Sequence, residues 1–185
     1  MAQVAKQEKV YTIDDIYTLP DGERAELIDG QIYYMAPPGT KHQRLVHFFD
    51  REIGNYIQQK HGECEVFPAP FAVFLNENNS SNYVEPDVSV ICDKNKITDK
   101  GCYGAPDWII EVVSPNSRRM DYYIKLFKYR TAGVKEYWIV DYEKNVVTVY
   151  DFQNNDGNDY TFSEKILVGI YSDLTIDLSM IKNSL

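Results

Sequence analysis

The amino-acid sequence predicts an α/β (α+β) domain, with a central mixed sheet flanked by helices and an N-terminal hairpin. In chain order we expect a hairpin, a helix, three strands, a second helix and a strand pair. The 185 residues contain no internal repeat and suit one compact core. We therefore expect residues 1–185 to form a single domain, with a helix and hairpin at 11–36, a core at 42–152 and C-terminal strands at 159–181.

The N-terminal part of the chain predicts a short helical stretch, a hairpin and then a long helix. The hairpin turn is expected at Asp29 and Gly30, because Asp-Gly between alternating apolar residues favours a tight turn. The long helix is expected from His42 to Lys60. Its apolar stripe should pack inward and contains Leu45, Val46, Phe49, Ile53, Tyr56 and Ile57.

Three apolar runs follow and predict strands at 65–75, 83–91 and 107–113. Between the last two lies a polar segment, 92–106, which is long enough for a mobile or functional loop. Each run is short and bounded by turn-forming residues. The three strands should therefore form the middle of the sheet.

A second helix is expected to begin at a cap provided by Asn116 or Ser117 and to run to Ala132, with Gly133 as its stop. Its predicted buried stripe contains Met120, Ile124, Phe127 and Thr131. Strands should follow at 136–141 and 145–152, then a loop at 154–159. The remainder, 160–181, predicts one or two closing strands and a short helical turn.

The composition predicts a folded chain outside the membrane. Hydrophobic residues make up 44% and aromatic residues 14% of the chain. No apolar run is long enough for a signal sequence or a membrane span, so we expect a cytoplasmic protein with no membrane partner. The cysteines, Cys64, Cys92 and Cys102, lack the spacing of a zinc site, and we expect reduced thiols that bind no metal.

The charge pattern is ambiguous for nucleic-acid binding. The net charge of −9 opposes strong non-specific binding, because affinity for phosphates depends largely on cationic side chains. Residues 114–135, however, carry six basic side chains against Asp121 alone, a local charge of +5. This segment is either a surface for nucleic acid or an ordinary solvated helix face.

Two aspartates, each preceded by proline, could act together with Glu111. Asp107 lies four residues from Glu111 on one strand, about 13 Å away, too far to share one small cation. Asp87 lies on a separate strand, and pairing of the two strands would bring the carboxylates to about 5 Å. Asp87 is therefore the better candidate ligand, although a residue after proline can also simply end a turn.

Glu111 is the only charged residue in an otherwise apolar strand. A carboxylate buried there without a partner would cost several kcal/mol, so it must be paired, protonated or bound to a metal. An ion pair with arginine is the main alternative to a metal. Two adjacent carboxylates would favour a hard, oxygen-preferring cation, and we expect Mg²⁺ with Asp87 and Glu111 as ligands.

Three parts of the sequence together resemble a known family. These are AELIDGQIYYMAPPGTKHQ, EPDVSVI and PDWIIEVVSPNSRRMDYYIKLFKYRTAGVKEYWIVD. The pattern is similar to the Uma-two family of restriction-type endonucleases, within the PD-(D/E)XK nuclease superfamily, and extends from about Tyr11 to Leu178. The resemblance implies a restriction-endonuclease-like αβββαβ core and Mg²⁺-dependent cleavage of DNA, with Mn²⁺ as a possible substitute. It also implies Asp87 and Glu111 as metal ligands.

One position departs from the superfamily motif, which has a lysine two residues after the acidic ligand. That position is Val113 here. Lys125, on the second helix, is similar to a lysine that has migrated in related families, and it could orient water, act as a base or stabilise phosphate charge. Alternatively, it forms an ordinary surface pair with Asp121. Glu26 could join the catalytic group, or could be an exposed carboxylate on a strand.

Further side chains are expected to contact DNA, namely His42, Gln43, Arg118 and Arg119. A helix cap or simple exposure is the alternative for His42. A homodimer would suit cleavage of both DNA strands, and Tyr137, Trp138 and Tyr150 could supply its interface. The alternative function is a catalytically inactive module that binds nucleic acid or protein, which Val113 and the net charge favour. A metal-dependent hydrolase with another substrate is a third possibility.

Overall fold

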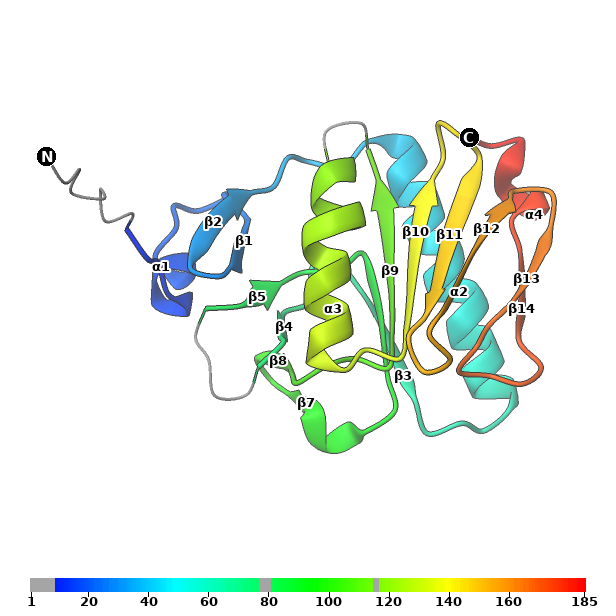
Figure 1. The fold of residues 1–185 in the computed structure, drawn as a ribbon, viewed down its shortest axis with the longest axis horizontal. Coiled ribbons are helices and arrows are strands. Elements are labelled where there is room, and N and C mark those ends of the chain that lie inside the picture. Colours follow the sequence, from blue (N-terminus) through cyan, green and yellow to red (C-terminus); the bar gives the residue numbers. More distant parts are fainter. Residues whose placement is uncertain (1–8, 77–80, 115–116) are drawn as a thin grey trace, which may run out of the picture.

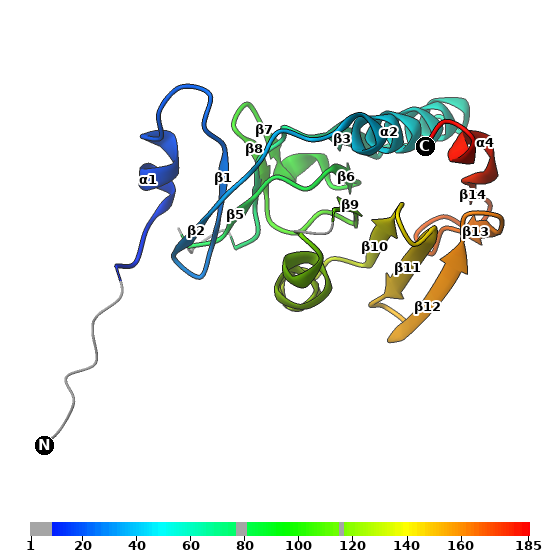
Figure 2. The same cartoon turned by 90° about the horizontal axis from the view of Figure 1, so that it is seen from above.

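The computed structural model describes residues 9–76, 81–114 and 117–185, and Figures 1 and 2 show its arrangement. The helical elements are α1 (Ile13–Tyr17), α2 (Thr40–Gln59), the 3-10 turn η1 (Lys94–Lys96), the π-helical segment η2 (Met120–Lys125), α3 (Leu126–Ala132) and α4 (Ser179–Lys182). The strands are β1 (Ala25–Ile28), β2 (Gln31–Tyr34), β3 (Glu65–Pro68), β4 (Val73–Phe74), β5 (Tyr83–Val84), β6 (Val88–Ile91), β7 (Ile97–Thr98), β8 (Gly101–Tyr103), β9 (Trp108–Val113), β10 (Glu136–Asp141), β11 (Val146–Asp151), β12 (Asp156–Thr161), β13 (Lys165–Leu167) and β14 (Thr175–Asp177).

The central sheet has the strand order β12-β11-β10-β9-β6-β3. β9 and β10 are parallel, whereas the other neighbours are antiparallel. Helix α2 covers one face of this sheet and η2–α3 lies on the opposite face (Figure 2). Along the chain, α2, β3, β6, β9, α3 and β10 follow in the order αβββαβ. The predicted mixed-sheet, restriction-endonuclease-like fold is therefore confirmed.

The period of two along β9 divides the core between the two faces of the sheet. Trp108 packs with Phe49 and Leu45 on the side of α2, whereas Ile109 packs with Tyr129 on the side of α3. The apolar stripe predicted for α2 is buried, apart from Tyr56, which is only partly covered, and Phe48 is buried as well. Apolar periodicity thus predicted this helix and the face that it buries.

A second sheet, with the order β2-β1-β5-β4-β8-β7, lies beside the first. The predicted hairpin forms its β1–β2 edge, and Asp29 and Gly30 make the turn with φ values of 50° and 74°. A Cβ on Gly30 would also lie 2.5 Å from Val10 Cγ1, so the turn requires glycine there. The hairpin prediction is confirmed.

Two runs expected to form single strands are instead divided between the two sheets. Residues 65–75 give β3 in the central sheet and β4 in the second sheet, and 83–91 give β5 and β6 in the same way. Pro86 separates β5 from β6, and proline lacks the N–H group that a continuous ladder needs. Segment 92–106, expected to be a loop, contains η1, β7 and β8. β8 pairs with β4, a distant partner that local polarity does not reveal.

The C-terminal prediction was wrong at one strand and right beyond it. Residues 154–159 were expected to form a loop, but β12 covers 156–161 and pairs with β11 along its whole length. β12 is an exposed edge strand, so backbone pairing holds it and an apolar pattern is not required. β13, β14 and α4 are the expected closing strands and helical turn.

The second helix buries a different face from the one predicted. Phe127 is 63% exposed and Thr131 is also exposed, whereas Asp121, Lys125 and Tyr129 are buried. The predicted stop is confirmed, since Gly133 ends the helix with φ 96°. Asn116, one proposed cap, lies outside the described residues. Polar side chains face inward here because the sheet offers them a charged partner, Glu111.

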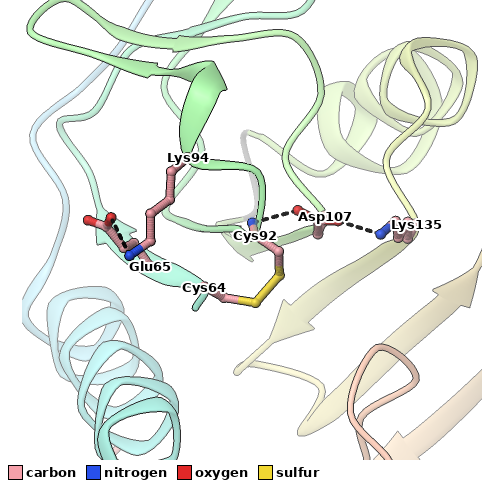
Figure 3. Close-up of a disulfide and its surroundings, with 6 residues drawn as sticks. All are labelled: Cys64, Glu65, Cys92, Lys94, Asp107 and Lys135. Atoms are coloured by element: carbon pink, nitrogen blue, oxygen red, sulfur yellow. Dashed lines mark hydrogen bonds and ion pairs between the residues drawn. A yellow bond between two sulfur atoms is a disulfide. The ribbon is translucent and has the colours of Figure 1, made fainter. Parts of the chain in front are cut away.

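The expectation of three reduced cysteines was wrong for two of them. A disulfide joins Cys64 to Cys92 (Figure 3), while Cys102 is free and buried. Cys64 precedes β3 and Cys92 follows β6, and the register of these strands places Glu65 opposite Ile91. The two cysteines therefore meet through strand pairing, which their separation in sequence does not reveal. Disulfides persist mainly in oxidising compartments. The disulfide therefore gives no support to the cytoplasmic location expected from the sequence, which stays a prediction.

The aromatic residues proposed for a dimer interface do not form one surface. Tyr137 and Trp138 are fully buried, and Tyr150 is half-buried and packs against the core. Their strands are covered on both faces, so large aromatic side chains there fill the core. Among the described residues, no helix is both long and apolar enough to cross a membrane.

Candidate functional site

Strand pairing brings Asp87 and Glu111 together. In the antiparallel β6–β9 pair Val88 lies opposite Ile110, so Asp87 is next to Glu111. The main-chain N–H of Val112 donates to Asp87 Oδ2 at 2.8 Å, and the N–H of Asp87 lies 3.4 Å from Glu111 Oε2. The predicted proximity of these two carboxylates is therefore present in the structure.

Lys125 reaches the buried carboxylate from η2. Its Nζ lies 2.9 Å from Glu111 Oε1 and 3.7 Å from Asp121 Oδ1. The surface pair with Asp121 considered above is therefore only a minor part of a buried cluster, since Lys125 is 5% exposed. Val113, at the expected lysine position, is fully buried in the apolar core on the same side of the sheet. An ammonium group thus reaches Glu111 from the helix instead of from β9.

Glu26 joins this cluster from the N-terminal hairpin. Its carboxylate lies 2.9 Å from Lys125 Nζ and accepts the N–H of Glu85 at 3.0 Å. Glu85 is itself held by Arg24 and by the hydroxyl of Tyr83. Glu26 is 4% exposed, so the reading of an exposed strand carboxylate is wrong. The hairpin and the central sheet therefore meet at one charged group.

The cluster carries more negative than positive charge. Three carboxylates, those of Glu26, Glu111 and Asp121, face one ammonium, and Asp87 adjoins Glu111. Burial raises the pKa of Glu111 well above its ordinary value, although Lys125 acts against the rise. Burial likewise raises the pKa of Asp121 to about 6. An additional cation would relieve this repulsion.

Lys125 remains an ammonium group in this arrangement. Burial alone would lower its pKa, but the charges of Glu111, Glu26 and Asp121 raise the pKa well above its ordinary value. Of the three roles considered for this lysine, the structure therefore favours orienting a reactant or stabilising phosphate charge over acting as a base. The same carboxylates and burial hold the pKa of Tyr129 high, so its hydroxyl stays a donor.

Asp87 and Glu111 fit a hard divalent cation. Their oxygen ligands are of the type that Mg²⁺ prefers, and the negative charge around them is only partly balanced. Within the described residues no three His, Cys, Asp or Glu side chains form a complete metal-binding group. Mg²⁺ commonly takes one or two carboxylates and completes its shell with water and substrate phosphates. Two carboxylates, of which Asp87 is partly exposed, meet that requirement.

The expected DNA contacts are differently placed. His42 Nε2 lies 3.1 Å from Asp87 Oδ2, at the metal-ligand candidate itself and not at a free surface. Arg118 pairs through two nitrogens with buried Asp141, at 2.7 and 2.9 Å. Gln43 and Arg119 are exposed. The structure therefore leaves two of these four side chains free for DNA, and ties the other two to carboxylates.

The basic run at 114–135 is not one positive surface. Most of its charges are paired within the fold: Arg118 with Asp141 and Glu143, Lys125 with its cluster, Lys128 with Asp29, and Lys135 with Asp107. Long-range packing brings an acidic partner to each of them, which the sequence does not reveal. The segment is therefore neither a fully solvated helix face nor a continuous positive surface, and Arg119 and Arg130 stay exposed. An interaction of this segment with DNA stays a prediction.

Asp107 has a structural place away from the cluster. Its carboxylate accepts the N–H of Cys92 at 2.7 Å and pairs with Lys135 at 2.6 Å (Figure 3). Its exclusion on distance therefore agrees with the geometry. Sequence reasoning missed Tyr129 and took Asp121 only as a surface partner of Lys125. The spacing of these three residues, four apart along one helix, was the signal that could have identified them.

A protein-family model described as "Putative restriction endonuclease", Uma2, matches residues 13–168. Two proteins of Synechocystis sp., both named as uncharacterized, are also similar. The first, sll1609, is 30% identical over 122 residues, which cover 64% of this chain and 67% of the relative. The second, slr1290, is 27% identical over 137 residues, covering 74% and 70%.

The fold resembles a solved structure from Anabaena variabilis, described as a "putative nuclease belonging to DUF820". The TM-score is 0.75 at 20% sequence identity, and the match covers 93% of this chain and 97% of the other. At this identity the likeness establishes the shared fold.

Proposed function

Because the chain belongs to the Uma2 family, we propose that it is a metal-dependent DNA endonuclease that hydrolyses phosphodiester bonds. The observation that carries this proposal is the contact of Lys125 with Glu111, next to Asp87. An ammonium beside two carboxylates on adjacent strands supports the nuclease motif despite Val113. The family and the fold support a nuclease in general, and the charge cluster supports the metal.

Each residue has a defined task in the proposed reaction. Asp87 and Glu111 would hold Mg²⁺, or Mn²⁺ in its place. The ion, when bound, would polarise the phosphodiester and lower the pKa of an attacking water. Lys125, as an ammonium, would orient that water or offset charge on the phosphate. Glu26 would also hold the Lys125 ammonium, so that Lys125 keeps its place when Glu111 binds a metal.

The DNA backbone would meet exposed polar and basic side chains near this cluster. We keep Gln43 and Arg119 as proposed contacts, because both are exposed. Further along helix α2, Arg44 and Arg51 line a groove of about 300 Å³ against α4. These two arginines would supply positive charge that the acidic chain otherwise lacks. A homodimer and a cytoplasmic location stay part of the proposal, and neither has a dedicated surface or signal among the described residues.

The decisive test is DNA cleavage with and without a divalent ion. Wild-type protein should cleave plasmid DNA in Mg²⁺ or Mn²⁺ and should lose this activity in EDTA. Glu111→Gln removes one proposed ligand at constant size and should abolish cleavage without lowering the melting temperature. Cleavage that persists in Glu111→Gln would remove this residue from the mechanism.

Asp107→Asn is the matched control, because Asp107 is also a buried carboxylate, directly before the same strand, but lies away from the cluster. This variant should keep cleavage. The alternative function, a catalytically inactive binding module, predicts no cleavage in any protein and no Mg²⁺ heat signal in calorimetry. A hydrolase with another substrate predicts metal binding without cleavage of DNA.

A further inference from the structure

On each proposed metal ligand, one oxygen already has two close partners. Glu111 Oε1 accepts from Lys125 Nζ at 2.9 Å and from the hydroxyl of Tyr129 at 2.7 Å. Asp87 Oδ2 accepts from the N–H of Val112 at 2.8 Å and lies 3.1 Å from His42 Nε2. The two sets of donors come from opposite sides of the sheet, since Tyr129 belongs to α3 and His42 to α2.

The other oxygen of each carboxylate is left nearly free. Among the described residues, Glu111 Oε2 meets only the N–H of Asp87, at a long 3.4 Å. Within the same ranges, no hydrogen bond or ion pair reaches Asp87 Oδ1. A carboxylate whose one oxygen has two close partners cannot rotate freely about its terminal bond. Glu111 Oε2 and Asp87 Oδ1 are therefore the oxygens available to a cation.

The imidazole of His42 is placed to serve Asp87 alone. Its Nδ1 is buried and has no hydrogen-bond partner among the described residues. A hydrogen on Nδ1 would be a buried donor without an acceptor, which is costly. Nε2 is therefore the ring nitrogen assigned the hydrogen, and it lies 3.1 Å from Asp87 Oδ2. His42 thus faces the carboxylate, and the phosphate contact expected from the sequence would require it to give up this contact.

We propose that Tyr129 and His42 are positioning residues, which orient Glu111 and Asp87 so that Oε2 and Oδ1 face a divalent cation. The proposal rests on the metal site of the proposed function and assigns that site two further residues. Partners that orient metal ligands typically change metal affinity by about 10–100-fold when they are removed. Neither residue touches the cation or the substrate, so their effect should reach the reaction only through the carboxylates.

Tyr137 provides a matched control for Tyr129. Both are fully buried tyrosines, and their rings pack edge to face with centroids 4.9 Å apart. The hydroxyl of Tyr137, however, donates to the main-chain oxygen of Asp121 and not to Glu111. Tyr129→Phe and Tyr137→Phe therefore each remove one buried hydroxyl from the same part of the core, but only the first removes a donor from the proposed metal ligand.

The experiment measures the Kd for Mn²⁺ by electron paramagnetic resonance of the free ion, in the full chain without DNA. Tyr129→Phe should bind Mn²⁺ about 10–100-fold more weakly than wild type. Tyr137→Phe should bind as wild type does. Equal affinity in Tyr129→Phe and wild type would overturn its positioning role. A wild type that binds no Mn²⁺ would overturn the proposed function together with this inference.

His42 supplies an independent test. It lies in the first turn of α2 and is partly exposed, so its substitution disturbs the core less. His42→Ala should weaken Mn²⁺ binding by a similar factor, and His42→Gln should restore part of it because its amide can donate to Asp87 Oδ2. Excess Mn²⁺ should also restore kcat in both positioning variants. Failure of excess metal to restore kcat, with Mn²⁺ affinity unchanged, would show that His42 contacts DNA instead.

Discussion

The two helices that flank the central sheet differ in what they bury. Helix α2 buries Leu45, Phe49 and Ile53, as its apolar spacing predicts. The segment η2–α3, on the opposite face, buries Lys125 and Tyr129. Apolar periodicity identifies the inner face of a helix that packs against an apolar surface. It fails where the facing strand presents a carboxylate, because a buried carboxylate must be paired. Polar side chains of the helix then take the inward positions, and the phenyl ring of Phe127 stays exposed.

The largest effect should follow from removing the buried ammonium. Lys125→Met keeps much of the side-chain volume but leaves Glu111, Glu26 and Asp121 without a cation. Breaking a buried ion pair on one side costs about 3–5 kcal/mol. We expect a loss of this size in the free energy of unfolding at pH 8, measured by urea denaturation, together with loss of cleavage.

This loss should shrink at pH 5. The folded-state pKa of Lys125 is raised, so its stabilisation is complete below its ordinary value of 10.5, and both pH values lie below that window. The difference between pH 8 and pH 5 arises from the carboxylates that face Lys125. Burial raises the pKa values of Glu111 and Asp121, so acid neutralises these carboxylates and they no longer need a cation. Leu45→Ala on α2 is the control and should cost about 2–5 kcal/mol at both pH values. If the loss in Lys125→Met were also the same at both pH values, charge would not be what holds the buried face of the second helix.

A smaller effect is expected for Asp121→Asn. Burial raises the folded-state pKa of Asp121 to about 6, above its ordinary value of 3.8. The folded state therefore binds this proton more tightly, and its stabilising contribution, complete below about pH 4, is lost as pH rises to about 6. At about 1.4 kcal/mol per pKa unit, the loss is on the order of 3 kcal/mol. Asp121→Asn should flatten the stability profile from pH 4 to pH 7, and an unchanged profile would assign the titration to another group.

The smallest effect is expected at the residue whose burial the sequence predicted wrongly. Phe127→Ser removes a ring that is 63% exposed, and surface changes usually stay within about 0.5 kcal/mol. Thermal unfolding should therefore give a nearly unchanged melting temperature. Phe49→Ser on α2 is the matched control and should be strongly destabilising, because Phe49 is fully buried. A large loss in Phe127→Ser would indicate that this face packs against another molecule.

Much of the fold was predictable because its signals are local. The hairpin turn at Asp29 and Gly30, the α2 stripe and the stop at Gly133 depend on backbone conformation or on periodicity within a few residues. The division of 83–91 into β5 and β6 was not predictable in the same way. It depends on which of two sheets each half joins, and those partners are distant in sequence.

Part of the candidate site was also predictable from local signals. Glu111 was identified because a charge inside an apolar strand requires a partner, and Asp87 because strand pairing sets a short distance. The pairing of Arg118 with Asp141 was not predictable, since the two residues are 23 apart in sequence. Tyr129 was missed because a tyrosine on a helix reads as ordinary core.

By itself, the sequence determined the αβββαβ order of the core, the pairing of Asp87 with Glu111 and the absence of lysine at position 113. Local spacing and the cost of burying a charge were sufficient for these. Only the tertiary structure decided that Lys125 points inward, that Glu26 reaches it from the hairpin and that His42 lies on Asp87. The direction of a polar side chain depends on which charges surround it, and those charges are brought together only by folding.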